Sequence, residues 1–287
     1  MIATIAEARG SGLTPSVGGA CRTLSLPRST WYRQQKQAGA PDPEIGLRDH
    51  IQRLALAISV YGYRRMTAEL RREGLIVNHK RVLRIMREDN LLCIRKRRFI
   101  KTTDSEHGLT VYPNLAAGLM VNDIDKLWVS DITYIRLQRE FVYLAVVLDA
   151  FSRKVIGWEL SRRIDTELTL AALRMALNKR TVRPGLIHHS DRGVQYAATD
   201  YTNLLKEKGI AISMSRKGNP YDNAQAESFM KTLKYEEVYL SDYANLSEAR
   251  ECIARFLNQI YNRERLHSKL GYIPPEEFEA KLNGQNQ

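Results

Sequence analysis

The sequence predicts an α/β fold, a mixed sheet flanked by helices, preceded by an all-α region that contains a helix-turn-helix. Between residues 44 and 90, apolar residues recur three times with the spacing of an amphipathic helix. Beyond residue 122, three segments rich in Val, Ile, Tyr and Thr come first, and helical and extended segments then alternate. Strands followed by alternating helices and strands are typical of a mixed sheet that helices cover.

The first 43 residues predict a small helical unit, with an apolar stretch at residues 17–26. The segment 39–43 contains two prolines and one glycine, which disfavour both helix and strand. We therefore expect a domain boundary near residue 43.

Residues 44–100 predict a helix-turn-helix domain that binds DNA. Its helices are expected at Ile45–Ile58, Tyr63–Glu73 and Lys80–Asp89. Gly74 can end the second helix and Asn78 can cap the third, as a helix-turn-helix requires.

The third of these helices has a basic face. Lys80, Arg84 and Arg87 share one side of the helix, and Arg81 lies beside them. Such a face can lie in a major groove with its cations on phosphates and base edges. A solvated charged face is the alternative that this helix alone leaves open.

The distribution of charge favours a polyanionic partner for the N-terminal part. The net charge is +12, and residues 1–110 carry 20 Lys and Arg against 10 Asp and Glu. Residues 111–287 carry 24 against 22. The positive excess, which includes the run Arg95–Arg98, therefore lies where phosphate contacts are expected.

Residues 101–122 show no sustained period and predict a connector to a catalytic core at residues 123–240. The core begins with a hairpin whose strands are Leu127–Leu137 and Phe141–Ser152. The later elements are a strand at Lys154–Ser161, a helix at Thr166–Arg180, a strand at Gly185–His189, a helix at Thr199–Lys208 and a strand at Ile210–Ser215.

Three acidic residues lie at positions suited to chemistry. Asp131 interrupts a strand, where a buried carboxylate is unfavourable unless it is paired, exposed at a cleft or bound to metal. Asp191 follows a short strand 60 positions later, and ligand sites gather at such strand ends. Glu227 is separated from Asp191 by 35 residues. Each residue alone is more often structural or solvated, but the set predicts one site.

Glu227 is expected on a helix that Asp222 caps, with Gln225 completing a capping box. This start places Glu227 in the second turn of the helix. Lys231 and Lys234 then share its face at i+4 and i+7, and both are candidates for contact with DNA.

The same three carboxylates are the candidate metal ligands. Their hard oxygens suit Mg²⁺ or Mn²⁺, and three of them can hold two ions roughly 4 Å apart astride a phosphate. One ion would activate the attacking water or 3′-hydroxyl, and the other would stabilise the departing oxygen. The sequence therefore predicts that Asp131, Asp191 and Glu227 catalyse phosphoryl transfer.

Together these motifs resemble the retroviral-integrase-like transposases of bacterial insertion sequences, most closely the second-reading-frame (OrfB) product of the two-frame family. Beside the triad, with its 35-residue second gap, the resemblance rests on Trp128–Tyr134, His189–Tyr196, Asn219–Phe229, Lys234, Tyr61–Arg64 and Tyr261–His267. It extends from about residue 15 to residue 280. No His-His-Cys-Cys zinc motif precedes the core, so the similarity to retroviral integrases themselves is limited to the core.

The resemblance implies a ribonuclease-H-like core, dependence on Mg²⁺ or Mn²⁺, cleavage at element ends and strand transfer into target DNA. The implied partners are terminal inverted repeats, target DNA, further copies of the chain and an upstream-frame (OrfA) protein or fusion. No apolar run of 18 residues and no secretory signal is present in the sequence. A location in the bacterial cytoplasm, on DNA, is therefore expected.

Two other functions stay open on the sequence alone. A nuclease of the same fold would hydrolyse DNA without joining it, and a DNA-binding regulator would use the core only for assembly. Both share the motifs above, so only a test of joining and of metal-dependent chemistry separates them.

Residues 241–287 predict a C-terminal helix and tail. The amphipathic segment Ser247–Tyr261 is expected to pack on the core or on a second subunit. After Pro274–Pro275, the Asn/Gln-rich tail is expected to be disordered. His188 and His189 are expected to be hydrogen-bonded at a strand end rather than to contact substrate.

Overall fold

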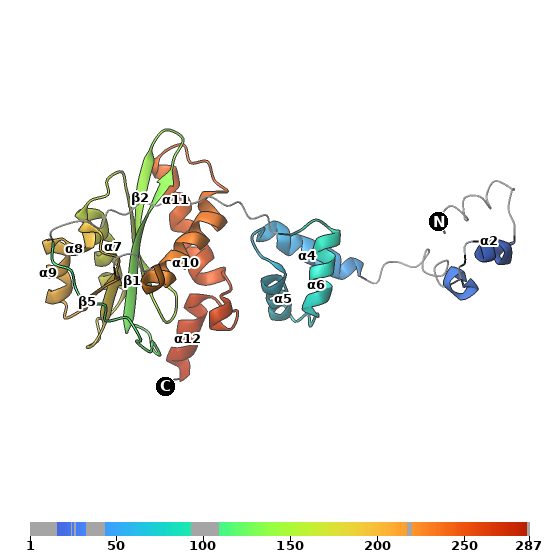
Figure 1. Cartoon of the computed structure of the whole chain (residues 1–287), viewed down its shortest axis with the longest axis horizontal. Coiled ribbons are helices and arrows are strands. Elements are labelled where there is room, and N and C mark those ends of the chain that lie inside the picture. The colour runs from blue at the N-terminus through green and yellow to red at the C-terminus, as the bar shows by residue number, and fades with distance from the viewer. Residues whose placement is uncertain are drawn as a thin grey trace. The chain divides into compact units, whose positions relative to one another are not determined.

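The computed structural model describes residues 16–23, 25, 27–32, 44–92, 109–216 and 220–285 (Figure 1). They fall into two units, which comprise residues 1–59 with 77–91 and residues 60–76 with 92–287. Within the described residues, every helix is too short or too polar to cross a membrane.

The first unit is helical. It contains α2 (Val17–Thr23), α4 (Ile45–Ala57) and α6 (His79–Glu88). The Asn78 side chain accepts a hydrogen bond from the Lys80 backbone N–H, which confirms the predicted cap of α6. Val82, Ile85 and Met86 are fully buried, so the predicted apolar face of α6 is confirmed as well.

Helix α5 (Tyr63–Arg72) belongs to the second unit. Just before it, the Tyr61 hydroxyl accepts a hydrogen bond from the Leu266 backbone N–H at 2.9 Å. Arg65 forms an ion pair with Glu236 at 3.2 Å. The segments around Tyr61 and Leu266, which the sequence singles out separately, are therefore in contact.

A five-stranded mixed sheet forms the centre of the second unit, with the strand order β3-β2-β1-β4-β5. The strands are β1 (Leu127–Arg136), β2 (Phe141–Asp149), β3 (Val155–Ser161), β4 (Ile187–Ser190) and β5 (Ala211–Met214). The first three pair antiparallel, whereas β4 runs parallel to β1 and β5 parallel to β4. Each predicted strand overlaps an observed one, and the α/β fold class is confirmed.

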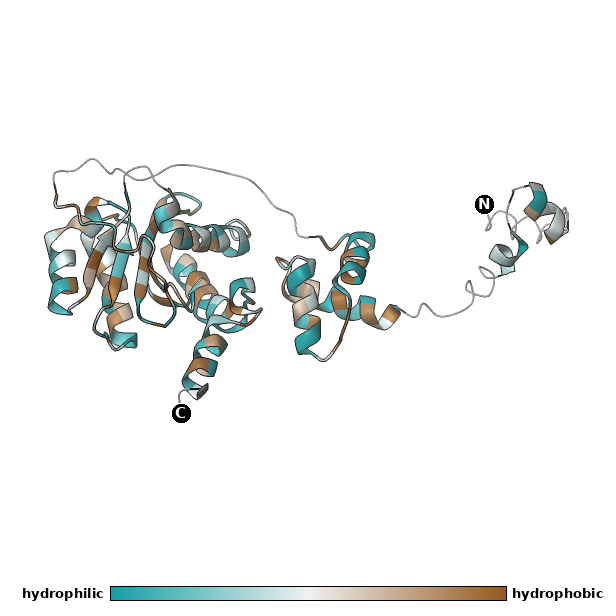
Figure 2. Cartoon of the chain, turned by 60° about the horizontal axis from the view of Figure 1, so that its bottom comes forward, coloured by the Kyte–Doolittle hydropathy of each residue, from teal (hydrophilic) through white to brown (hydrophobic). Residues whose placement is uncertain are grey.

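Helices cover both faces of this sheet (Figures 1 and 2). One layer consists of α7 (Thr166–Lys179), α8 (Val194–Ala197) and α9 (Thr199–Glu207). The other contains α10 (Ala224–Leu233), η2 (Lys234–Val238), α11 (Leu246–Arg255) and η3 (Phe256–Glu264). One apolar cluster lies between the sheet and each layer of helices. Ala249, Ile253 and Phe256 belong to the cluster between the sheet and the layer that contains α10. The predicted helix at residues 247–261 therefore packs on the core.

The expectation of a disordered tail is wrong as far as residue 285, because a helix extends to that point; residues 286–287 lie outside the described residues. After the short η4 (Ser268–Leu270), α12 runs over Pro275–Gln285. Proline is well suited to the first position of a helix, where its missing N–H costs nothing. Buried Glu279 pairs with Arg180 and, at 3.3 Å, with Lys154, which fastens α12 to the core.

Candidate active site

Asp131 lies in the middle of β1, and Asp191 directly follows the end of the neighbouring parallel strand β4. In the pairing of β1 with β4, Val129 lies opposite His189, and the partners differ by 60 in number. Asp131 and Asp191 each lie two residues beyond this last pair and differ in number by the same 60. The 60-position spacing in the sequence is therefore the register of a parallel strand pair.

The half-buried Asp131 carboxylate is influenced by both of the other predicted carboxylates. Its Oδ1 accepts a hydrogen bond from the Ile132 N–H at 2.9 Å. Burial, then the charge of Asp191 and then that of Glu227 raise the pKa of Asp131 to about 8, while Lys234 opposes the rise. The structure thus brings the three carboxylates and Lys234 into one electrostatic neighbourhood.

A tight turn holds the Asp191 carboxylate. Its Oδ1 accepts a hydrogen bond from the Gly193 N–H at 2.9 Å. A Cβ at Gly193 would lie 3.0 Å from that oxygen and 3.2 Å from Gln195 Oε1. Glycine therefore keeps the space beside the carboxylate free of side-chain atoms.

Glu227 lies on α10, but the helix begins differently from the prediction. The N-cap is Asn223, whose side chain makes no capping bond, and Glu227 lies in the first turn. Asp222 instead accepts hydrogen bonds from the backbone N–H and guanidinium of Arg216, so the predicted capping box is wrong. Asn223 Nδ2 donates to Ser130 O at 3.1 Å, which ties the start of α10 to β1 beside Asp131.

The two lysines that follow Glu227 differ in environment. Lys231 is exposed, whereas Lys234 is half-buried, with its ammonium 4.3 Å from the centre of the Tyr134 ring. Burial lowers the pKa of Lys234, and the charge of Asp131 opposes this effect. Lys234 therefore belongs to the carboxylate site, and Lys231 lies on the surface of the same helix.

The two histidines of β4 are buried and hydrogen-bonded, as expected. His188 Nε2 bonds to Ser130 Oγ at 2.8 Å and to the Tyr201 hydroxyl at 3.0 Å. His189 forms one hydrogen bond with Ser213 Oγ in β5, at 2.8 Å, and one with Ser215 Oγ just after β5, at 3.1 Å. Burial lowers the pKa of His188 to about 3, so it is neutral at physiological pH and structural in character.

The donor types at this site fit a divalent cation. Three carboxylates offer the hard oxygen ligands that Mg²⁺ and Mn²⁺ prefer. Two buried polar atoms nearby, the Tyr196 hydroxyl and Asn223 Oδ1, have no hydrogen-bond partner among the described residues. Burial first and then Tyr201, Asp191 and Asp131 raise the pKa of Tyr196, so its hydroxyl lies within electrostatic range of both aspartates. Unpartnered buried polar atoms beside carboxylates suit a hydrated ion.

The three carboxylates do not form a closed set of ligands as they stand. Among the residues that the structure describes, no three His, Cys, Asp or Glu side chains are close enough to hold one ion. Glu227 is exposed, and at least one side chain must therefore move for an ion to be bound by all three.

Sequence reasoning assigned no role to Tyr196 and Asn223. Tyr196 lies in the motif His189–Tyr196 and Asn223 in the motif Asn219–Phe229, but a tyrosine and an asparagine at such positions are ordinary structural residues. Only their burial without a partner distinguishes them, and this depends on contacts that the sequence does not reveal.

The four predicted DNA contacts of α6 are exposed, but two of them are already engaged. Arg81 and Arg84 lie 2.7 and 2.6 Å from the carboxylate oxygens of Glu44, which precedes α4. The hydrogen bonds from Arg84 and Arg81 lower the pKa of Glu44 to about 2. Lys80 and Arg87 have no carboxylate within 4 Å among the described residues. Glu44 therefore competes with DNA phosphates for Arg81 and Arg84, and Glu88 also pairs with Arg84 at 3.0 Å.

Family models match most of the chain. A model of an HTH-like domain matches residues 44–99, and two models of an integrase core domain match residues 123–220 and 208–275. The HTH-like match contains α4 to α6. The two integrase-core matches contain the sheet and both of its helical layers.

Curated relatives match over nearly their whole length. The chain is 41% identical over 272 residues to an insertion element IS600 protein of 31 kDa from Shigella sonnei, covering 92% of this chain and 98% of that protein. It is 36% identical to the transposase InsF for insertion sequence IS3A from Escherichia coli, covering 93% and 94%. The catalytic core of the HTLV-2 integrase, solved with magnesium, aligns at 18% identity with a TM-score of 0.41, covering 54% of this chain and 95% of that one.

Proposed function

The chain belongs to the insertion-sequence transposases with an integrase core domain, and we propose that Asp131, Asp191 and Glu227 are its catalytic residues. They would cleave DNA at the ends of the element and join those ends to target DNA. The observation that supports this assignment is the electrostatic coupling of the three carboxylates beside the middle of β1 and the end of β4. Carboxylates that raise one another's pKa at a strand end form a site for cations.

An integrase core uses divalent metal, and we propose that the same three carboxylates hold it as two Mg²⁺ or Mn²⁺ ions. When bound, such ions would activate the attacking water or 3′-hydroxyl and stabilise the oxygen that leaves. Lys234 and Lys231 would neutralise phosphates next to the scissile one. Asn223 would hold the helix of Glu227 against β1, and the buried Tyr196 hydroxyl would donate to a carboxylate or to an ordered water.

The other parts of the chain would position DNA. We propose that residues 44–100 bind the terminal repeats through α6, with 1–43 as a separate helical unit and 101–122 as the connector. Residues 123–240 would form the catalytic core, and 241–287 would complete it. Further copies of the chain and an upstream-frame protein would be partners in the assembly on DNA.

Joining separates a transposase from a nuclease. Precut duplexes carrying the terminal repeat should become covalently linked to a target plasmid when the full chain and Mg²⁺ are added. Gel analysis of the plasmid measures this directly. Hydrolysis without linked product would support a nuclease instead. Binding without metal-dependent chemistry, even with the upstream-frame protein added, would support a regulator.

Replacement of Glu44 should strengthen DNA binding through α6. Glu44→Gln removes the charge that engages Arg81 and Arg84. Arg81 then becomes available to phosphates, whereas Arg84 keeps its ion pair with Glu88 at 3.0 Å. We expect tighter binding of a terminal-repeat duplex and a salt slope steeper by about one unit for each arginine that contacts phosphate. Fluorescence anisotropy at several salt concentrations measures both quantities.

Asp49→Asn is the matched control for this experiment. It removes the same charge from α4, but Asp49 pairs with the exposed Arg53 rather than with α6. Equal effects of the two substitutions would mean that Arg81 and Arg84 do not contact DNA.

A further inference from the structure

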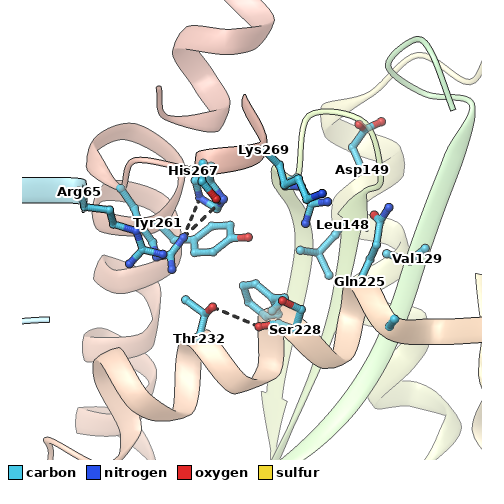
Figure 3. A pocket seen from close by; sticks show the side chains of 15 residues that line it. Arg65, Val129, Leu148, Asp149, Gln225, Ser228, Thr232, Tyr261, His267 and Lys269 are labelled. Atoms are coloured by element: carbon cyan, nitrogen blue, oxygen red, sulfur yellow. Dashed lines mark hydrogen bonds between the residues drawn. The ribbon is translucent and has the colours of Figure 1, made fainter. Parts of the chain in front are cut away.

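A cavity of about 440 Å³ lies along α10, apart from the three carboxylates (Figure 3). The ends of β1 and β2 contribute Val129 and Leu148, and α10 contributes Gln225, Ser228 and Thr232. The segment from Tyr261 to Lys269 forms the opposite wall. Its volume lies within the range of about 300–1,000 Å³ that is usual for ligand sites.

The lining of this cavity is strongly basic. It contains four cationic side chains, Arg65, Arg153, Arg265 and Lys269. Arg65 and Arg265 both pair with Glu236, at 3.2 and 2.6 Å. Arg153 and Lys269 have no carboxylate within 4 Å in the part of the chain that the structure describes. Two positive charges therefore line the cavity without compensation.

The one carboxylate in the lining, Asp149, forms no ion pair with these cations in the part of the chain that the structure describes. Asp149 is fully buried, and its oxygens accept hydrogen bonds from the backbone N–H groups of Asp125, Phe151 and Ser152 and from the Ser152 hydroxyl. Backbone and hydroxyl donors therefore bind this carboxylate rather than the basic side chains.

The positive charges of the cavity affect His267, which lies in the same wall. Burial, followed by the charges of Arg265, Arg65 and Arg153, lowers the pKa of His267 to about 3. The imidazole is therefore neutral at physiological pH and adds hydrogen-bonding capacity without charge. Cations, hydroxyl groups and a neutral imidazole together are suited to an anion with several acceptor oxygens.

The cavity and the carboxylate site occupy two sides of α10. Gln225, Ser228 and Thr232, at i, i+3 and i+7, line the cavity, whereas Glu227 and Lys231, at i and i+4, face the other side. Ala224, Glu227, Ser228 and Lys231 are all exposed, so an open surface of the helix joins the two sites.

We propose that this cavity binds a backbone phosphate of the DNA strand that occupies the carboxylate site. The proposal rests on the proposed function, because only a bound strand would connect the two sides of α10. A helix with its side chains is about 10–12 Å across, and phosphates follow one another at about 3.4 Å along each strand axis. The contacted phosphate therefore lies about three to four nucleotides from the scissile one.

A phosphate scan of the DNA tests the proposal on the full chain. Terminal-repeat duplexes are made in which one phosphate at a time is an uncharged methylphosphonate, and binding is measured by anisotropy in Ca²⁺ without cleavage. Loss of the phosphate three to four nucleotides from the cleavage point should weaken binding by the wild type about tenfold, the usual size of a charged hydrogen bond. The same DNA change should have no further effect on Lys269→Glu or Arg153→Asn.

The variants are chosen so that the fold is preserved. Lys269 is exposed, and Arg153 has φ +61°, a left-handed conformation that asparagine adopts more readily than most residues. Lys208→Glu, on the helical layer across the sheet, is the control and should keep the full effect of the methylphosphonate. Because binding is measured without catalysis, the phosphate effect can be read whether or not Glu227→Gln abolishes cleavage.

Two outcomes would overturn the proposal. The first is a methylphosphonate effect of equal size in wild type, Lys269→Glu and Arg153→Asn, which would place that phosphate elsewhere. The second is a rise in melting temperature with a free nucleotide or pyrophosphate that Lys269→Glu abolishes, while no single phosphate of the DNA matters. The cavity would then be a site for a small anion rather than for DNA.

Discussion

Glu227→Gln is expected to abolish Mg²⁺-dependent cleavage while binding of the element ends persists. Glutamine has nearly the same shape, but a neutral amide is a poor ligand for a hard cation. Metal catalysis of phosphoryl transfer contributes several kcal/mol, so the rate should fall by about three orders of magnitude or more. Cleavage of an end-labelled duplex and anisotropy of the same duplex measure the two properties separately.

The position of Glu227 makes this test clean. It is exposed in the first turn of α10, so its replacement removes no packing from the core. Glu167→Gln is the matched control, because Glu167 is an exposed glutamate in the first turn of α7, where it pairs with Arg174. Cleavage at the wild-type rate by Glu227→Gln would reject the proposed catalytic triad.

Much of the architecture follows from local patterns. Segments rich in Val, Ile, Tyr and Thr define β1 and β2, and the breaker Gly74, at φ +87°, ends α5 as expected. The spacing of 60 between Asp131 and Asp191 is a consequence of the β1–β4 register. These features could be predicted because each depends on residues that are neighbours in sequence or on one pairing.

The predictions that failed depend on partners outside the local pattern, either a few residues away or in distant parts of the chain. Asp222 does not cap α10 because Arg216 takes its carboxylate. The tail after Pro275 is helical because Glu279 finds Arg180 and Lys154 in the core. The basic cavity joins residues between positions 65 and 269, and no local pattern connects them.

The affinity of the metal-free protein for Mn²⁺ is expected to fall steeply in mild acid. The pKa of Asp131 is about 8, because of burial, Asp191 and Glu227, so a proton must leave before this carboxylate can bind an ion. Affinity should therefore drop about tenfold for each pH unit below 8 and become constant above it. Calorimetric titration of Mn²⁺ between pH 6 and pH 9 measures the profile.

A charge change beside Asp131 should move this profile. Lys234 lowers the pKa of Asp131, so Lys234→Met should shift the dependence toward higher pH without removing a ligand. Lys231→Met, one turn earlier on the exposed surface, is the control and should shift it less. An affinity that is flat between pH 6 and pH 8 would contradict the assignment of Asp131 as a ligand.

The raised pKa of Asp131 also affects stability: the ionised carboxylate that a metal ion needs destabilises the metal-free fold. The folded pKa of Asp131 lies above its ordinary value of 3.8, so the metal-free folded state binds more protons and loses stability as pH rises from about 4 to about 8. Asp131→Asn cannot ionise, and at pH 8 it should melt above the metal-free wild type, by about 2–4 °C for each kcal/mol gained. Mn²⁺ should raise the melting temperature of the wild type far more than that of the variant. A bound cation would relieve the loss of stability that the ionised Asp131 causes in the metal-free protein. A variant that melts below the wild type at pH 8 without metal would show that ionised Asp131 does not destabilise the fold.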